Sequence, residues 1–286
     1  MAACSVREIL NQVGALAFPG IYDTLSAKLA EQAGFPMGFI SGYSLAAATI
    51  GEPDFGLLTQ TEVIERARAI CSSVSFPVIV DADTGYGNPL NVYRTVELLI
   101  NAGAAGCFLE DQVWPKKCGH MRNKKVIARK DYLQKIQAAV DARGEHDFFI
   151  VARTDAEAVY GLDEAIARVT KARELGADAG FVEAPGSIRQ LEKIGLQAPK
   201  PLVANMIEGG KTPVLPKERL EALGFELILY PLTGLFAASH ALRNSYSLLY
   251  QKGTTLEMEG DLFSFSEFNE LIGVEEKYRL SEKYGE

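Results

Sequence analysis

The chain has 286 residues, of which 48% are hydrophobic and 23% are charged. These values are typical of a folded globular protein and exclude a disordered or fibrous chain. The 37 acidic and 29 basic residues give a net charge of -8, which disfavours nucleic acid and anionic membranes as partners. An anionic substrate therefore requires a local cationic pocket.

The cysteines and the apolar segments predict a cytoplasmic protein. Four cysteines in so long a chain do not make a disulfide framework, and none form a C-x-x-C pair. No segment resembles a signal peptide or an uncharged apolar membrane span. The cysteines are Cys4, Cys71, Cys107 and Cys118.

Eight short apolar runs rich in Val, Ile, Leu and Phe predict strands that are buried on both faces. Helical patterns separate them, and several of these end at a glycine shortly before the next strand. Such alternation without a linker predicts a single closed (β/α)₈ TIM barrel over residues 1–254. The runs cover residues 15–19, 37–42, 77–83, 106–111, 148–155, 180–184, 201–206 and 225–231.

The third connection shows the helical signature most fully. Asn88 is the expected N-cap, Pro89 stands in the first turn, and Gly103 is the expected stop. The same stop is expected at Gly34, Gly176 and Gly224. Residues 255–286 follow the eighth strand as an amphipathic extension, which we expect to pack on the barrel or on a partner subunit.

Polar residues follow six consecutive predicted strands. Because the carboxyl ends of barrel strands meet at one face, we expect these side chains to form the active site. They are Ser41, Gly42, Asp81, Asp83, Glu110, Asp111, Arg153, Asp155, Glu183 and Asn205.

Asp81 and Asp83 share one face of their strand, and the run before them is wholly apolar. Their charges would repel each other unless a cation or a proton offsets them. With Glu110 they offer three hard oxygen donors, which favours Mg²⁺, or Mn²⁺, over zinc. The alternative is that these acids cap helices or pair with arginines.

Residues 110–125, EDQVWPKKCGHMRNKK, combine a thiol, an imidazole and several cations after the fourth strand. Lys116, Lys117, His120 and Arg122 could close over a carboxylate substrate, or they could form a solvated basic loop. Because neighbouring cations lower a thiol pKa, we expect Cys118 to titrate near neutrality and to act as an acid–base group. A buried or surface thiol is the alternative.

Six motifs together resemble the isocitrate lyase and phosphoenolpyruvate mutase superfamily, and K-K-C-G-H is specific to its lyase branch. Within that branch, the residues of the motifs resemble those of proteins that cleave 2-alkylmalates and hydrolyse oxaloacetate. The motifs are SGYS (41–44), DADTGYGN (81–88), LEDQVWPKKCGH (109–120), ARTDA (152–156), FVEAP (181–185) and NMIEGGKTP (205–213).

The resemblance implies a barrel whose last helix is swapped between subunits of a homotetramer. It implies Mg²⁺ ligands at Asp81, Asp83 and Glu110, with Asp54 in the outer shell, and catalytic roles for Cys118, Lys116, His120 and Arg153. The implied substrate-binding residues are Ser41, Gly42, Tyr43, Gly119, Glu183, Asn205 and Thr233.

Phe236 and Phe265 stand where methylisocitrate lyases place arginines for a third carboxylate. This favours a dicarboxylate with an apolar arm over a tricarboxylate, with Tyr43, Tyr86 and Trp114 as further pocket residues. The predicted reaction is a retro-Claisen cleavage to an α-keto acid and a carboxylate, with oxaloacetate hydrolysis as a related activity. Alternatives are methylisocitrate or isocitrate lyase, a phosphonate mutase or hydrolase, and an inactive binding protein.

Overall fold

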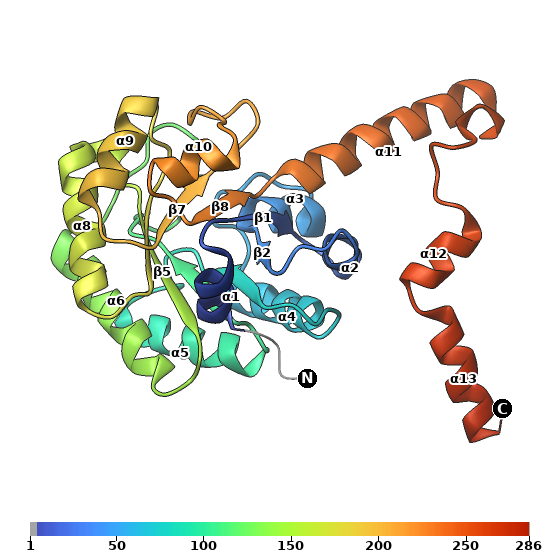
Figure 1. Ribbon diagram of the computed structural model, residues 1–286, viewed down its shortest axis with the longest axis horizontal. Coiled ribbons are helices and arrows are strands. Elements are labelled where there is room, and N and C mark those ends of the chain that lie inside the picture. Colours follow the sequence, from blue (N-terminus) through green and yellow to red (C-terminus); the bar gives the residue numbers. More distant parts are fainter. Residues whose placement is uncertain (1–4, 286) are drawn as a thin grey trace. The chain divides into compact units, whose positions relative to one another are not determined.

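A computed structural model describes residues 5–285, so Cys4 lies outside the described residues. Eight parallel strands close into a barrel in sequence order, β1 to β8, with β8 paired to β1. Helices surround the strands (Figure 1). The predicted (β/α)₈ TIM barrel is therefore confirmed.

Each predicted apolar run overlaps one observed strand. Six strands lie within their runs, whereas β1 continues two residues past its run and β6 begins one residue before its run. The strands are β1 (Leu16–Ile21), β2 (Gly38–Ile40), β3 (Val78–Asp81), β4 (Gly106–Leu109), β5 (Phe149–Thr154), β6 (Ala179–Val182), β7 (Leu202–Asn205) and β8 (Leu227–Tyr230).

The helices begin and end where the local signals predict. Asn88 caps α5 (Pro89–Asn101) by accepting from the backbone N–H groups of Leu90 and Asn91, and Gly103 follows with φ +87°. The other helices of the barrel are α1 (Val6–Val13), α2 (Thr24–Gln32), α3 (Gly42–Ile50), α4 (Gln60–Cys71), α6 (Arg129–Arg143), α7 (Glu157–Tyr160), α8 (Leu162–Glu174), α9 (Ile188–Gln197) and α10 (Lys217–Ala222).

Large apolar side chains fill the barrel interior. Phe39 and Phe108 lie with ring centroids 4.6 Å apart, and Phe108 contacts Phe181 edge to face at 5.6 Å. Further apolar clusters lie between the strands and the surrounding helices. The interior is a packed core on which a site at the strand ends can rest.

The chain divides into two compact units, Met1–Leu235 and Phe236–Glu286. The sequence analysis placed the boundary after residue 254, whereas this division assigns nearly all of α11 (Thr233–Lys252) to the second unit. That unit also contains η1 (Leu256–Met258), α12 (Phe265–Leu271) and α13 (Val274–Tyr284).

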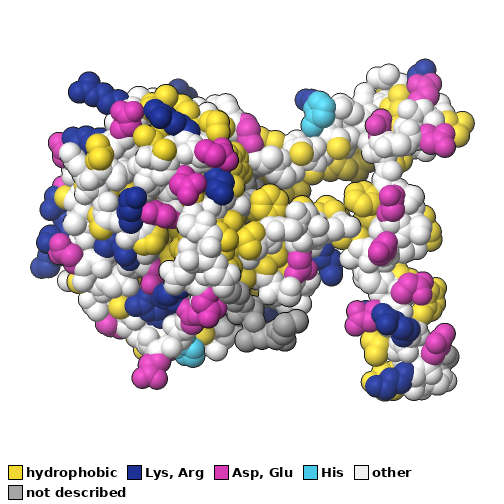
Figure 2. All heavy atoms as spheres, viewed as in Figure 1, with side chains coloured by type: hydrophobic (Ala, Val, Ile, Leu, Met, Phe, Trp, Pro, Cys, Tyr) yellow, Lys and Arg dark blue, Asp and Glu magenta, His cyan; other side chains and the backbone are white. Residues whose placement is uncertain are grey.

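Acidic and basic side chains are interspersed over the visible face of the barrel unit (Figure 2). Within residues 5–285, no helix has the length and apolar character needed to cross a membrane.

Candidate active site

The side chains that face the barrel interior change from apolar to polar at the carboxyl ends of the strands. In three strands an inward phenylalanine is followed two residues later by a polar group, because successive side chains alternate between the two faces. The pairs are Phe39 and Ser41, Phe108 and Glu110, and Phe181 and Glu183. The site therefore rests on an aromatic floor.

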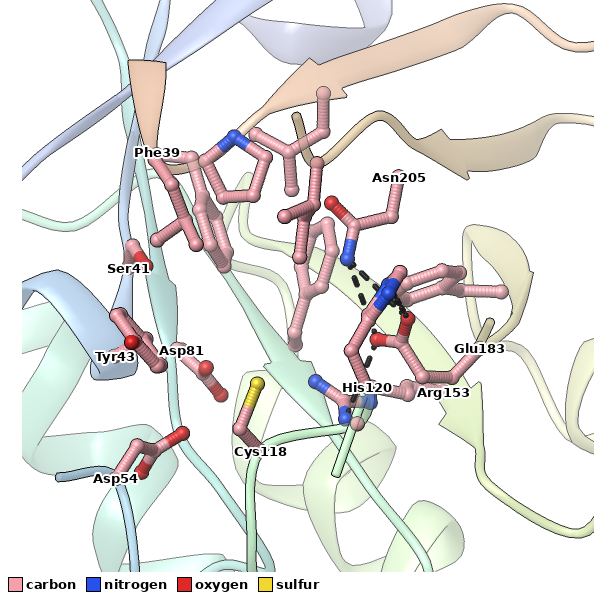
Figure 3. A pocket seen from close by; sticks show the side chains of 17 residues that line it. Phe39, Ser41, Tyr43, Asp54, Asp81, Cys118, His120, Arg153, Glu183 and Asn205 are labelled. Atoms are coloured by element: carbon pink, nitrogen blue, oxygen red, sulfur yellow. Dashed lines mark hydrogen bonds and ion pairs between the residues drawn. The ribbon is translucent and has the colours of Figure 1, made fainter. Parts of the chain in front are cut away.

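A cavity above this floor brings together ten of the residues predicted from the sequence. Figure 3 shows Asp54 and Asp81 on one side, Arg153, Glu183 and Asn205 on the other, and the sulfur of Cys118 between them. The ten predicted residues are Ser41, Tyr43, Asp54, Asp81, Cys118, Gly119, His120, Arg153, Glu183 and Asn205.

The carboxylates of Asp81 and Asp83 lie against the backbone of Gly42. A Cβ atom at position 42 would come within 2.9 Å of Asp81 Oδ2 and 3.4 Å of Asp83 Oδ1, so glycine permits this close approach. The backbone N–H of Asp83 donates to Asp81 Oδ1 at 3.1 Å. Asp83 has φ +49°, which is uncommon outside glycine and occurs often at functional sites.

The Lys116 ammonium lies among the acids. It is 2.7 Å from Asp54 Oδ1 and 2.6 Å from Asp83 Oδ1, and its side chain is 2% exposed. Burial alone would lower the pKa of Lys116, but the charges of Asp83 and Asp54 outweigh it and raise the pKa well above its usual value. Lys116 therefore supplies one permanent positive charge to the acidic side of the cavity.

Two carboxyl groups remain short of positive charge. Burial raises the pKa of Asp83 to about 7 although Lys116 opposes the shift, and burial raises the pKa of Glu110 well above its usual value although Arg153 opposes it. Glu110 Oε1 is buried without a hydrogen-bond donor.

A divalent cation would relieve these groups, and carboxylate oxygens are the ligands that Mg²⁺ prefers. Within the described residues, no three Asp, Glu, His or Cys side chains are already gathered into a metal-binding group. The donor chemistry therefore fits a hard cation, while the acids are at present held by Lys116 and Arg153.

The opposite side of the cavity is built around the buried guanidinium of Arg153. Its Nη2 lies 3.1 Å from Glu110 Oε2 and 3.3 Å from Glu183 Oε2, and its Nε donates to Asp155 Oδ2 at 2.9 Å. Burial would raise the pKa of Glu183, but Arg153, His120 and Lys124 together outweigh burial and lower it. Glu183 is therefore a carboxylate, and Arg153 is held in one orientation by three acids.

Residues 116–124, here called the covering loop, lie closed over the cavity. A Cβ atom at Gly119 would come within 2.3 Å of Glu183 Cγ and 2.5 Å of Arg153 Nη2, so only glycine lets the loop approach this closely. Lys124 Nζ donates to Gly119 O at 2.5 Å and lies 2.6 Å from Asp155 Oδ1. The Lys124 side chain is 1% exposed and attaches the loop to Asp155, which also accepts a hydrogen bond from Arg153.

The environment of Cys118 corrects one expectation. The sequence predicted that the neighbouring cations would lower its pKa towards neutrality. Burial instead raises the pKa of Cys118 to about 11, with the charges of Asp54 and Glu183 adding to the rise and Arg153 opposing it. The expectation was wrong because Lys117 and Arg122 line a different cavity. Cys118 is a protonated thiol that points into the site (Figure 3).

His120 joins the covering loop to two other segments. Its Nε2 lies 3.1 Å from Glu183 Oε1, and its Nδ1 accepts a 2.9 Å hydrogen bond from the backbone N–H of Lys211. The backbone N–H of Cys118 donates to Asp54 O at 3.1 Å. These contacts attach the covering loop to Asp54 on one side of the cavity and to Glu183 and Lys211 on the other.

Several predicted residues do not line the cavity. Thr233 is exposed and donates to Glu208. Tyr86 and Trp114 pack edge to face with ring centroids 5.8 Å apart and are not among the residues that line the cavity. Their packing is the alternative to a pocket role that the sequence left open. Gly42, Asp83, Glu110 and Lys116 lie behind the lining residues, within contact of them.

Sequence reasoning did not assign Lys124, Gln112 or Arg168 to the site. Gln112 exchanges two hydrogen bonds with the backbone of Lys117, at 2.8 and 3.1 Å. Arg168 is buried and lies 3.0 Å from Asp111, which accepts from the backbone N–H of Asp155 at 2.8 Å. Asp111 and Arg168 are 57 residues apart and Lys124 and Asp155 are 31 apart, so no local signal identifies these contacts.

The chain resembles enzymes of one family over nearly its whole length. The family model for phosphoenolpyruvate phosphomutase matches residues 6–249. The petal death protein of Dianthus caryophyllus is 48% identical over 98% of this chain and 88% of its own length. The chloroplastic carboxyvinyl-carboxyphosphonate phosphorylmutase of Arabidopsis thaliana is 49% identical (97% and 83%), and the 2,3-dimethylmalate lyase of Eubacterium barkeri is 41% identical (99% and 98%).

Solved structures give the same result. Oxaloacetate acetylhydrolase in complex with 3,3-difluorooxalacetate superposes with a TM-score of 0.93 at 34% identity, covering 99% of this chain and 97% of that one. Phosphonopyruvate hydrolase in complex with oxalate and Mg²⁺ superposes with a TM-score of 0.88 at 31% identity, covering 98% of both chains. The motifs, the barrel and the relatives agree, and the chain belongs to the phosphoenolpyruvate mutase and isocitrate lyase superfamily.

Proposed function

We propose that this protein is a Mg²⁺-dependent carbon–carbon lyase that cleaves 2-alkylmalate-type dicarboxylates to an α-keto acid and a carboxylate. Hydrolysis of oxaloacetate to oxalate and acetate is the proposed related activity. A lyase for 2,3-dimethylmalate and an oxaloacetate acetylhydrolase are among the similar proteins, which supports both parts of the proposal.

The observation that carries the proposal is the position and protonation of Cys118. Its sulfur points into a cavity between an acidic side and a cationic side, and its thiol keeps its proton at neutral pH. Cleavage of the C2–C3 bond leaves the electron pair on C3 as an aci-carboxylate, and the 2-hydroxyl group loses its proton as the keto group forms. The Cys118 thiol can deliver the proton that this carbon then needs.

Other residues of the chain bind and orient the substrate. Arg153 is permanently charged and faces the cavity, so it can pair with a substrate carboxylate and with the charge that develops on the aci-carboxylate. Asn205 Oδ1 is buried without a donor, which leaves it available to a substrate hydroxyl group.

Asp81, Asp83 and Glu110, with Asp54 as an outer-shell acid, are the residues that would hold Mg²⁺. The bound ion would supply the positive charge that stabilises an oxyanion at C2. A solved complex of the similar phosphonopyruvate hydrolase contains oxalate and Mg²⁺, which supports Mg²⁺ as the ion. Lys116 pairs with Asp54 and Asp83 and offsets part of the negative charge of this group.

The lining of the cavity favours a dicarboxylate with an apolar arm. Arg153 is its one arginine among the described residues and His120 its one histidine, so a third carboxylate has no dedicated cation. An alkyl group gains about 0.8 kcal/mol per buried CH₂. The apolar lining residues are Phe39, Phe108, Phe181, Ile207, Leu229, Pro231 and Leu232.

A substrate panel tests the proposal. We would measure kcat/KM with Mg²⁺ for 2-alkylmalates, oxaloacetate, isocitrate, methylisocitrate and phosphonopyruvate, with EDTA-treated enzyme as the control. The expected result is Mg²⁺-dependent release of keto acid from a 2-alkylmalate at the highest kcat/KM. Preference for a tricarboxylate or for phosphonopyruvate would contradict the proposal.

We also propose that the C-terminal unit packs on a second copy of the chain in a homotetramer. This unit exposes apolar side chains, including Phe263 at 53%, Phe265 at 85% and Ile272 at 44%, which a single chain leaves in water. Analytical ultracentrifugation should give four times the 31.1 kDa chain mass, and a chain ending at residue 254 should assemble with fewer than four subunits. A tetramer of the truncated chain would contradict the swapped helix.

A further inference from the structure

A second cavity lies on the other side of the covering loop from the active site. Its lining includes Phe55, Lys117, Met121, Arg122 and Lys211. His120 lines both cavities, with Nε2 towards Glu183 on the inner side and Nδ1 towards Lys211 on the outer side. One imidazole therefore stands between the two spaces.

The two cavities differ greatly in size. By the same measure the inner cavity is about 30 Å³ and the outer cavity is about 520 Å³. Sites for small molecules are commonly about 300–1,000 Å³, so the outer cavity alone has room for an organic anion while the covering loop is closed.

The outer cavity carries positive charge without carboxylate partners. Lys117, Arg122 and Lys211 form no ion pair within residues 5–285, and no acidic residue lines the cavity. The Lys117 ammonium lies 5.7 Å from the centre of the Phe55 ring, and Lys211 Nζ donates to Met121 O at 3.4 Å.

Some exposed cations elsewhere on the barrel pair with acids, as Lys171 does with Glu174 at 2.6 Å and Arg219 with Glu192 at 4.0 Å. Others, such as Arg94 and Lys130, are unpaired among the described residues, so the outer cavity is distinguished by three unpaired cations that line one hollow. In a chain with a net charge of -8, three unpaired cations around one hollow concentrate positive potential there. The pattern is that of a site for an anion.

We propose that the outer cavity is an anion-binding antechamber that captures the dicarboxylate dianion before the covering loop opens. The identity of the anion as substrate rests on the proposed lyase function. Lys117, Arg122 and Lys211 attract the two carboxylates, and Phe55 and Met121 contact the apolar part of the ligand. The antechamber raises the rate of capture and leaves the chemical step unchanged, because none of its three cations lines the inner cavity.

The binding test uses malonate, a dicarboxylate dianion, and the fluorescence of Trp114, the one tryptophan of the chain. Trp114 lies beside the outer cavity, because a Cβ atom at Gly56, next to Phe55, would be 3.1 Å from its ring. The test variant is R122Q/K211Q, and the control R219Q/K171Q removes equal charge from the barrel exterior. We expect malonate affinity at low salt to fall about tenfold in the test variant and less than twofold in the control.

The kinetic test uses the salt dependence of kcat/KM for the best substrate of the panel. The kcat/KM of the wild type should fall about tenfold between low and high salt. The kcat/KM of R122Q/K211Q should be lower than that of the wild type at low salt and should change little with salt. The kcat of this variant should stay within about twofold of the wild-type value. Lys211 contacts His120 through its backbone N–H, which glutamine preserves.

Equal behaviour of the test and control variants, or no malonate binding to the wild type, would overturn the antechamber. If no compound in the panel is cleaved, the malonate titration still decides whether the anion site exists. If a compound of the panel is cleaved but R122Q/K211Q and R219Q/K171Q have the same malonate affinity and salt dependence, the antechamber is refuted and the lyase function is not.

Discussion

The covering loop presents a lysine on each of its two sides, buried among acids on the inner side and without an acidic partner among the described residues on the outer side. Lys116 is buried and paired with two acids, whereas Lys117, the next residue, lines the outer cavity and pairs with none of the described acids. Cys118 again points inward. This alternation is that of an extended chain, and it shows that a run of basic residues can serve two sites at once.

The largest effect is expected for Cys118→Ser. If the thiol protonates the leaving carbon, kcat should fall about 10² to 10⁴-fold while the affinity for Mg²⁺ stays within about twofold. Steady-state kinetics and a Mg²⁺ titration give the two values. Cys71→Ser is the control because Cys71 lies at the end of α4, and turnover near the wild type in Cys118→Ser would refute the role of the thiol.

The adjacent lysines Lys116 and Lys117 test the comparison directly. Lys116→Met should lower kcat by about 100-fold or more, because it leaves Asp54 and Asp83 buried without their counter-charge. Lys117→Met should leave kcat within about twofold. Similar kcat values for the two variants would mean that the inner and outer positions are not functionally distinct.

Lys124 and Lys125 form a second matched pair. Lys124→Met should lower kcat/KM about 10 to 100-fold, because the covering loop loses its attachment to Asp155 and the Asp155 carboxylate loses a buried partner. Lys125 is exposed, so Lys125→Met should change kcat/KM by less than about twofold. The loop should also be cut faster by chymotrypsin in Lys124→Met, and equal cleavage rates would count against the attachment.

The pH dependence sharpens the assignment of Cys118 as an acid. An acid works while it is protonated, so its activity is lost as pH rises through its pKa. With the pKa raised to about 11, kcat at pH 9.5 should be about tenfold higher than for a thiol of ordinary pKa near 8.5. A pH–rate profile of the Mg²⁺-loaded enzyme checks this, and an alkaline loss centred near 8.5 would contradict the buried acid.

The sequence was sufficient for features that depend on neighbouring residues. Strands buried on both faces give continuous apolar runs, and Gly34, Gly103, Gly176 and Gly224 all adopt positive φ after helices, as their sequence positions predict. The polar residues at the strand ends were predicted for the same reason, because parallel strands of a barrel bring their carboxyl ends together.

Features that depend on distant partners could not be read in this way. The burial of Lys124 depends on Asp155, and the raised pKa of Cys118 depends on burial by the whole loop. The composition of residues 110–125 allowed either a loop that closes over a carboxylate or a solvated basic loop, because it does not record which side chains turn inward.

The hydrogen bond from Lys211 to His120 has a consequence for proton transfer. A backbone amide can only donate, so Nδ1 of His120 must offer its lone pair, and the neutral ring carries its hydrogen on Nε2. His120 in this tautomer presents a donor to Glu183 and to any oxygen that enters the cavity, and it has no inward lone pair with which to accept a proton. Under the proposed lyase function, His120 in this tautomer would stabilise negative charge, and the base would have to be another group.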